Sequence, residues 1–488
     1  MKKILLLVLT LFLSTTVLLA GCGDKGLKNN PNTNDPVTSN GGMAVLKGNY
    51  LYYVNGFKSY DGLVKDKDNV WGEQKLGAIY RVKVVNNQIA HDQNGFLAES
   101  ECVVPQIVGT ENASFYIFGD YIYYATPNMQ KDKNGNLLNA RSNICRVNIN
   151  GTNNDVLYTT EQTLTASNWT INDVNGTVYI IISDGSKVIS INANAKKPEA
   201  TTLTSNATSV GLIKIDNNVN AISNALVDGI NNYVYYTRNF VEADNLEGRS
   251  GNILARVKLG TTTEEVVTNN GNYTYQIKEA KNGCLYYNKT SVATSNTVLC
   301  KYALSKDKAF KQNNEVELAS ATYTTTIVLN SNNENYVGAD VLTINESNQI
   351  ALISVVNGNK NITNIYKGTE TIKVLGLYGS KLFFLEGSTI KYVNVTDLAV
   401  EVKTVETNNK TIKTDVNTFF DYDGRNVYFY ASYTPESGEG SNYYLNRTDL
   451  EAGTQKSEFV GVFMEGHTPA KPEADNDDDP ENDPVWIS

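Results

Sequence analysis

Histidine is almost absent from this chain, because only His91 and His467 occur among 488 residues. Imidazole is the side chain that most often exchanges protons near neutral pH, and it is a frequent metal ligand. Two histidines exclude an imidazole-cluster metal site and leave His91 as the one base for a Ser-His-Asp or Cys-His arrangement. His91 lies in a polar stretch typical of a turn, so we interpret it as a surface histidine. We expect no metal and no cofactor.

Cysteine is also scarce, with five residues and no C-x-x-C pair. This excludes a disulfide-dense scaffold and a zinc site of the common spacing. Cys284 and Cys300 are predicted to lie on adjacent antiparallel strands, offset by about one position. A disulfide needs Cα atoms within about 7 Å, so this pair is a hypothesis that the sequence leaves open.

Basic residues are fewer than acidic ones, which gives the chain a net charge of -10. An acidic protein is a poor partner for nucleic acid or for anionic lipid. Residues 465–488 concentrate acidic residues and proline, and we interpret them as a disordered tail. A calcium loop of the EF-hand type is disfavoured there, because Pro480 and Trp486 occupy the positions that require Gly and Glu.

The first residues resemble an export signal. Lys2 and Lys3 precede the largely apolar run Ile4–Leu19, which is shorter than the roughly 20 residues of a membrane-spanning helix. The tetrad Leu19-Ala20-Gly21-Cys22 then resembles the bacterial lipobox. This resemblance implies a signal peptide over 1–21, removed during export, and lipidation of Cys22. The polar segment 22–42 is predicted to be a disordered tether, which would place the protein on the extracellular face of the cytoplasmic membrane.

A repeat runs through residues 43–464. Its best copy has strand-like runs at Phe115–Phe118, Gly119–Tyr124, Ile144–Ile149 and Asp155–Tyr158, separated by turn signals. The second run recurs about eight times, at roughly 54 residues per unit, near the length of a four-stranded propeller blade. The second runs are apolar on both faces, as in sheets that are sandwiched between neighbours.

These patterns predict an all-β fold, a single β-propeller with about eight four-stranded blades. A β-solenoid is disfavoured because its repeats are shorter and more regular. Seven blades remain an alternative, because the sixth and seventh copies, at Asn348 and Gly379, are close together. In that case Thr324–Glu346 would be an irregular segment.

The repeat Gly-x-x-Ile-Tyr-Tyr, followed by Ile-x-Arg-Val-x-Ile-Asn-Gly-Thr-Asn, resembles the YWTD β-propeller of low-density-lipoprotein-receptor-type proteins. More closely, it resembles an uncharacterised family of Gram-positive lipoproteins that carry such a propeller. The match covers about Met43–Met464 and is best in units one, two, four and five. Tyr123-Tyr124-Ala125-Thr126 stands where the family has Tyr-Trp-Thr-Asp. The resemblance implies a fold and a location, and it transfers no catalytic residues.

The tyrosine pairs of the second strands are interpreted as core between blades. Binding residues are expected in loops, and the loops between second and third strands are long in units eight, one, two and four. Units eight, one and two are neighbours in a closed ring, so three long loops would lie side by side. They contain aromatic residues and an arginine, which commonly anchor interfaces: Phe57, Tyr60, Trp71, Arg141 and Tyr433.

We therefore expect an extracellular binding or scaffolding protein whose partner is a cell-wall polymer or a protein, and no enzyme. One alternative is a propeller-fold carbohydrate-active hydrolase that uses paired carboxylates, although sequence alone cannot pick the pair. Another is a structural cell-envelope assembly protein without a small ligand.

Overall fold

The computed structural model describes residues 42–463 except 57–75, 92–96, 98, 109–114, 137, 139, 166–167, 175–176, 213–231, 242–243, 245–250, 282–283, 304–314, 321–324, 329–340, 345–347, 357–358, 379, 396–400, 414–419 and 435–441. In this part the chain forms 33 β-strands and no α-helix. The predicted all-β class is confirmed. Helices long and apolar enough to cross a membrane are absent from the described residues. Cys22 and the segments 1–41 and 464–488 lie outside them.

The first four sheets are each built from consecutive strands. Sheet one contains β1 (Ala44–Lys47), β2 (Tyr50–Val54), β3 (Ile79–Val85), β4 (Gln88–Ile89) and β5 (Glu101–Val104). Sheet two contains β6 (Phe115–Phe118), β7 (Tyr121–Pro127), β8 (Ser142–Asn148) and β9 (Asp155–Thr159). Sheet three contains β10 (Trp169–Val174), β11 (Thr177–Asp184), β12 (Lys187–Asn192) and β13 (Ala200–Thr204). Sheet four contains β14 (Ala207–Gly211), β15 (Tyr233–Asn239), β16 (Asn252–Lys258) and β17 (Glu264–Thr268).

The last four sheets follow the same order. Sheet five contains β18 (Tyr273–Lys281), β19 (Cys284–Ser291), β20 (Thr297–Ala303) and β21 (Glu315–Ser320). Sheet six contains β22 (Thr325–Val328), β23 (Val341–Ile344), β24 (Gln349–Val356) and β25 (Asn359–Lys367). Sheet seven contains β26 (Ile372–Tyr378), β27 (Lys381–Glu386), β28 (Thr389–Asn394) and β29 (Lys403–Thr404). Sheet eight contains β30 (Phe420–Tyr422), β31 (Asn426–Tyr433), β32 (Asn442–Asp449) and β33 (Ser457–Phe459).

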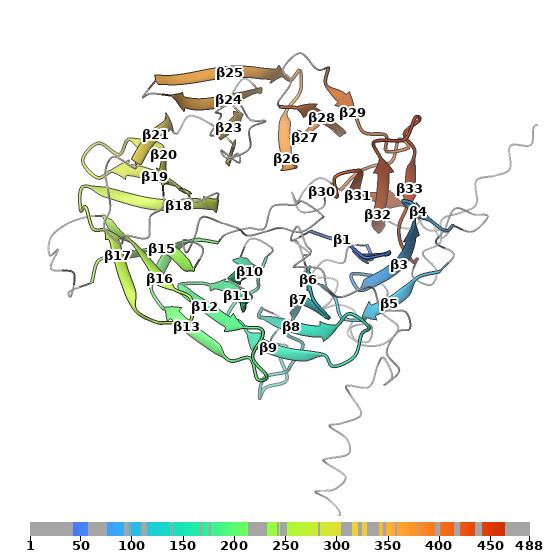
Figure 1. Cartoon of the computed structure of the whole chain (residues 1–488), viewed down its shortest axis with the longest axis horizontal. Coiled ribbons are helices and arrows are strands. Elements are labelled where there is room, and N and C mark those ends of the chain that lie inside the picture. Colours follow the sequence, from blue (N-terminus) through green and yellow to red (C-terminus); the bar gives the residue numbers. More distant parts are fainter. Residues whose placement is uncertain are drawn as a thin grey trace, which may run out of the picture.

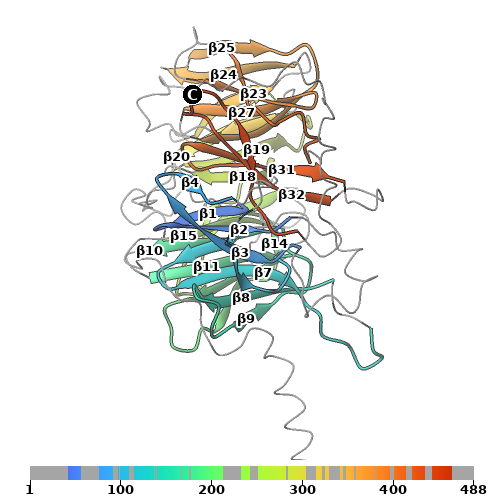
Figure 2. The same ribbon diagram turned by 90° about the vertical axis from the view of Figure 1, so that its right-hand side faces the viewer.

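The eight antiparallel sheets follow one another around a ring, with the first strand of each sheet towards the middle (Figure 1). Seen from the side, they form one flattened layer (Figure 2). This is a propeller-like arrangement. Sheet one differs from the others because β3 continues past β5 into a hairpin with β4.

The sixth repeat is corrected by the structure. We expected Gln349–Ile353 to be a second strand, but it belongs to β24, the third strand of sheet six. The second strand is β23, and Thr324–Glu346, which looked irregular, contains both β22 and β23. The close spacing of the sixth and seventh copies therefore came from aligning a third strand with a second strand.

Hydrophobic clusters fill every junction between neighbouring sheets. One cluster joins sheets eight, one and two, with Leu445, Leu51 and Ile122 among its buried members. The others join sheets two and three, three and four, four and five, five and six, six and seven, and seven and eight. The last sheet thus packs against the first, and burial of apolar surface is the main favourable term at each junction.

The paired tyrosines of the second strands occupy opposite faces of their sheets, because side chains alternate along a strand. In sheet two, the Tyr124 hydroxyl reaches Asn154, just before the fourth strand. Tyr236 and Tyr287 bond to Glu264 and Glu315 at the start of theirs. All three tyrosine side chains are buried. The expectation that these pairs form core between units is confirmed, and the hydroxyls of Tyr124, Tyr236 and Tyr287 also have polar partners.

In sheets one, two and four, the other tyrosine of the pair faces an arginine on the third strand. Arg81 lies opposite Tyr52, its Nη1 is 3.4 Å from the hydroxyl, and its Nε donates to Glu101 on β5 at 2.8 Å. Arg256 repeats this arrangement with Tyr235 and Glu265. A buried guanidinium is tolerated because a carboxylate and a hydroxyl share its donors.

Candidate functional site at the loop face

The loops between second and third strands lie at the same edge of the ring as the linkers between sheets, because consecutive strands are antiparallel. We call this edge the loop face. One long loop of this face, the β15–β16 loop, belongs to sheet four. Three further long loops are the β2–β3 loop of sheet one, the β7–β8 loop of sheet two and the β31–β32 loop of sheet eight. Sheet one packs against both sheets two and eight, so these loops start from neighbouring sheets.

The bases of the three long loops touch one another. Gly56 begins the β2–β3 loop with φ +68°, and a Cβ built on it would lie 2.9 Å from the carbonyl oxygen of Tyr443 on β32. Leu76, at the other end of that loop, packs in one cluster with Tyr433 and Tyr444 of sheet eight. Towards sheet two, a Cβ on Gly77 would lie 3.2 Å from Ile107. Ile107 in turn packs against Met129 of the β7–β8 loop. The expectation that these loops are neighbours is confirmed at their bases.

Of the five residues predicted to bind a partner, the structure describes two. Phe57, Tyr60 and Trp71 lie in 57–75, outside the described residues. Arg141 is exposed at the end of the β7–β8 loop, where its carbonyl accepts from the Asn128 amide at 2.9 Å. Of the two described residues, Arg141 is therefore accessible to a partner.

The structure corrects the prediction for Tyr433, which is a core residue and not a surface anchor. It is 9% exposed, its hydroxyl donates to Asn446 Oδ1 at 2.8 Å, and its ring packs edge-on against Tyr444 and Phe459. Burial raises the pKa of Tyr433, so the hydroxyl stays protonated. Tyr433 is the last residue of β31, and the alternation of side chains along this strand places it on the same face as Phe429 and Ala431. That face packs in the interface between sheets seven and eight.

Lys410 covers the same tyrosine and was missed by sequence reasoning. Its ammonium lies 3.8 Å from the centroid of the Tyr433 ring, and desolvation lowers its pKa. A cation at this distance is attracted by the ring face. Lys410 belongs to the linker between sheets seven and eight, and no pattern in the sequence distinguished it from the other lysines.

Carboxylates on the loop face hold the chain together. Asp184 ends β11 and accepts from the Glu161 amide, at 2.9 and 3.1 Å, and from the Tyr158 hydroxyl at 3.0 Å. Glu386 ends β27 and does the same for the linker before sheet seven, where it accepts from the Thr369 amide at 2.6 Å. Both acids precede a tight Gly-Ser hairpin turn. They fix the linker that arrives from the preceding sheet.

A second group of carboxylates surrounds Arg238 at the end of β15. The guanidinium donates to Asp244 at 2.7 and 2.9 Å and to Glu264 at 2.6, 2.9 and 3.1 Å. Hydrogen bonds from Arg238 lower the pKa of Asp244, and in Glu264 they outweigh the burial that raises it. Both acids are therefore ionised partners of one cation, which is the opposite of the raised pKa that a general acid needs.

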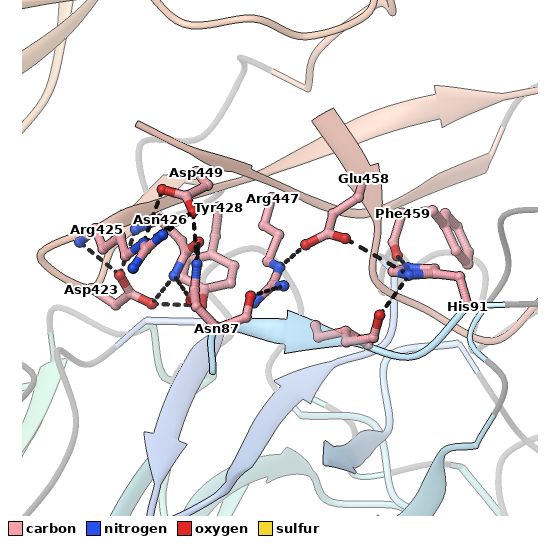
Figure 3. Close-up of polar contacts among 11 residues, drawn as sticks. Asn87, His91, Asp423, Arg425, Asn426, Tyr428, Arg447, Asp449, Glu458 and Phe459 are labelled. Carbon is pink, nitrogen blue, oxygen red and sulfur yellow. Dashed lines mark hydrogen bonds and ion pairs between the residues drawn. The ribbon is translucent and has the colours of Figure 1, made fainter. Parts of the chain in front are cut away.

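His91 is also corrected, because it is a link between the first and last sheets and no plain surface histidine. Its Nδ1 lies 2.9 Å from the Ile89 carbonyl oxygen, and its Nε2 lies 2.9 Å from the Phe459 carbonyl oxygen of β33 (Figure 3). Glu458 is 3.7 Å away. The β3–β4 hairpin carries the imidazole to sheet eight, a distance of 368 residues along the chain.

The seam between sheets one and eight contains further polar contacts. Asn87, at the tip of the β3–β4 hairpin, donates to Asp449 at 2.9 Å and exchanges hydrogen bonds with Asn426 (Figure 3). Arg447 donates to the Asn87 carbonyl at 2.9 Å. Asn86 and Asn87 have φ of 51° and 61°, which suits a two-residue hairpin turn. The Asn-Asn pair between apolar runs was the signal that could have located this hairpin.

The proposed disulfide is excluded by the strand register. Cys284 lies opposite Ala303, and Cys300 lies opposite Tyr287, three positions away. An odd offset puts the two thiols on opposite faces of the sheet, and they pack in different clusters. Both are free. The predicted offset of about one position is three in the structure, where the β19–β20 loop runs between Ser291 and Thr297.

Metal-binding groups of three or more His, Cys, Asp or Glu residues do not occur in the part of the chain that the structure describes. Together with the engaged carboxylates, this leaves the loop face as the surface with features of a binding site: long neighbouring loops on a packed base. Arg141 contributes an exposed guanidinium to this face.

Comparisons with known proteins found similar chains among solved structures. No protein-family model matches the chain, and no curated protein matches its sequence. Among solved structures, a prolyl endopeptidase is similar at 9% identity and TM-score 0.40, covering 86% of this chain and 55% of that one. A puromycin hydrolase is similar at 10% identity and TM-score 0.43, covering 73% and 54%. The nidogen/laminin complex is similar at 9% identity and TM-score 0.24, covering 68% and 90%. The chain spans about half the length of the two hydrolytic enzymes.

Proposed function

We propose that this chain is a lipid-anchored extracellular protein that binds or scaffolds a partner through the loop face of a closed, eight-bladed β-propeller. The observation that carries the proposal is the contact among the bases of the three long loops. Gly56, Leu76 and Gly77 of the first loop touch sheet eight on one side and the linker beside Met129 on the other. Loops held on a common packed base present one continuous surface.

The apolar junctions between neighbouring sheets support this proposal, because sheets packed in this way would give a rigid support for loops. The eight sheets have eight apolar junctions, including the one between the last sheet and the first. The Tyr430 hydroxyl donates to the Val54 carbonyl at 3.1 Å across this last junction. A rigid support lowers the entropy lost when loops bind a partner.

The hydrolase alternative receives no support from the described carboxylates. A glycosidase needs one acid with a raised pKa beside an ionised one. Asp244 and Glu264 share Arg238, and Glu386 accepts from Lys391 at 2.5 Å. These groups act as anchors for chain segments, so we propose binding and not turnover.

Binding is tested with purified domain and isolated cell envelopes. We expect Trp71→Ala and Tyr60→Ala to weaken retention about tenfold or more, as for interface anchors, with little change in melting temperature. Asp120→Ala, in the exposed β6–β7 turn at the opposite edge, is the matched control and should retain binding. Unchanged retention in both loop variants, or turnover of a glycan or peptide by the domain, would refute the binding proposal.

Anchoring is tested separately by replacing the proposed lipid-bearing residue. Cys22→Ala should release the protein from the membrane fraction, because the mature chain would carry no acyl chains. Membrane association equal to that of the native chain would count against the anchor.

A further inference from the structure

The chain enters the ring at the loop face. Ala44, the first residue of β1, pairs with Tyr53 near the end of β2. The carbonyl of Met43 accepts from the Val54 amide at 2.8 Å, and the β2–β3 loop begins at the next residue. Met43 is fully buried, so the point of entry is fixed in the core beside the base of that loop.

The chain also leaves the ring at the loop face. After β33, the amide of Val462 donates to Asn55 Oδ1 at 2.9 Å, and Asn55 Nδ2 donates to the Val462 carbonyl at 2.8 Å. Asn55 is fully buried and begins the β2–β3 loop. One asparagine side chain therefore holds the C-terminal segment against the residue where the longest loop starts.

We infer that the loop face is the membrane-facing side of the anchored protein, and that its partner is a protein embedded in the same membrane. This inference rests on the proposed anchor at Cys22. The linker 23–42 joins that anchor to Met43, and a coil of this length spans roughly 25 Å. The attachment point is on the loop face, so the opposite edge, with the Gly119-Asp120 turn, is held farther from the bilayer.

The charge of the protein decides between the components of the membrane. A net charge of -10 disfavours contact with an anionic lipid surface. Arg141 is exposed on the loop face, and Lys410 is stacked on Tyr433. The exposed guanidinium of Arg141 suits a protein partner, because arginine is enriched in interfaces between proteins.

The orientation is tested with the lipidated, full-length mature protein in phosphatidylcholine vesicles that carry a headgroup quencher. Cys102, the one partly exposed cysteine that the structure describes, is replaced by Ser. A fluorophore is then placed at Lys133→Cys in the β7–β8 loop or at Asp120→Cys at the opposite edge of the same sheet. Both positions are exposed.

We expect at least twofold stronger quenching at position 133 than at position 120, and a larger ratio when residues 29–38 are deleted. Equal quenching, or stronger quenching at position 120, overturns the orientation although the anchor holds. Failure of the native protein to bind vesicles, with the Cys22→Ala protein as reference, overturns the anchor and the inference together.

The partner class is tested with the unlipidated Cys22→Ala domain and three probes: isolated membranes, protease-treated membranes and isolated cell-wall polymer. Retention on membranes that falls at least tenfold after protease treatment supports a membrane protein. Retention that survives protease indicates lipid, and retention on wall polymer alone indicates a glycan. Either result overturns the partner class and leaves the proposed binding function standing.

Discussion

At the residue scale, several buried charged groups in this protein are held in ion pairs. Arg238 is 6% exposed in its side chain and neutralises Asp244, which is 9% exposed. Lys289 is paired with Glu315 at 2.5 Å in sheet five. A buried pair is costly to break, because the remaining partner stays desolvated and charged.

Arg238→Met tests this at the most connected cation. We expect a loss of about 3–5 kcal/mol in the free energy of unfolding, because Asp244 and Glu264 lose their shared cation. Urea denaturation measures it. Lys187→Met, which breaks the more exposed pair with Glu161, is the control and should cost less than about 1 kcal/mol. Similar losses in both variants would contradict the structural role of Arg238.

We expect Glu386 to contribute to the loss of folding stability at low pH. Burial alone raises its pKa, but hydrogen bonds from Lys391, Tyr366 and the Thr369 amide outweigh it and lower the pKa to about 2. A depressed folded-state pKa gives stability that is fully present above the unfolded value of about 4.3 and is lost as pH falls towards 2. We expect Glu386→Gln to remove this slope, measured as unfolding free energy between pH 5 and pH 2. An unchanged slope would show that the carboxylate is not bound in this way.

At the element scale, glycines in turns allow neighbouring sheets to approach. Gly151, in the β8–β9 turn, has φ +85°, and a Cβ on it would lie 2.9 Å from the Val103 carbonyl oxygen on β5 of sheet one. Gly119, in the β6–β7 turn of the same sheet, has φ +53° and open space around it. A side chain at Gly119 would therefore meet only backbone strain, whereas one at Gly151 would meet the same strain and a close contact with sheet one.

We expect Gly119→Ala to destabilise the protein by about 1 kcal/mol, the cost of a left-handed residue with a side chain. Gly151→Ala should cost about 2–3 kcal/mol, because a backbone oxygen cannot move aside and overpacking is added to the strain. Thermal unfolding of both variants checks the difference. Equal costs would mean that sheets one and two are not packed this closely at the turn.

At the scale of the whole molecule, the ring is joined by side chains and not by a strand shared between the ends. Each sheet consists of consecutive strands, and sheets one and eight are linked through Asn55, Asn87, His91 and Tyr430. Each such bond contributes about 1 kcal/mol, and the apolar cluster beneath them supplies the larger share.

Asn55→Ala tests the seam. The variant leaves the amide and carbonyl of Val462 without their partner, so we expect a loss of about 2 kcal/mol in the unfolding free energy. The loss should appear in a single transition that near-UV and far-UV circular dichroism report together. Thr290→Val, which breaks a hydroxyl pair within sheet five, is the control with little effect. Separate transitions of two parts of the ring would argue against closure.

Much of the fold was determined locally and could be predicted from the sequence. Alternating and doubly apolar runs bounded by glycine and asparagine turns specify antiparallel strands, and their repetition specifies equivalent sheets. Tyr52-Tyr53 and Tyr123-Tyr124 were correctly assigned to the core, because a strand buried on both faces needs apolar residues in succession. The weak sixth repeat was misaligned, because β22 and β23 lack the tyrosine pair that marked the others.

Only the tertiary structure decided which polar residues meet. His91 contacts Phe459 across 368 residues, and Asn55 contacts Val462 across 407, distances over which no periodicity carries information. Strand length decided that Tyr433 is buried, and strand register decided that Cys284 and Cys300 lie on opposite faces of their sheet. A shift of one residue in register moves a side chain to the other face. Sequence patterns determine the strands through local sterics and burial, whereas packing of the last sheet against the first brings distant residues into contact and thereby determines the seam and the loop face.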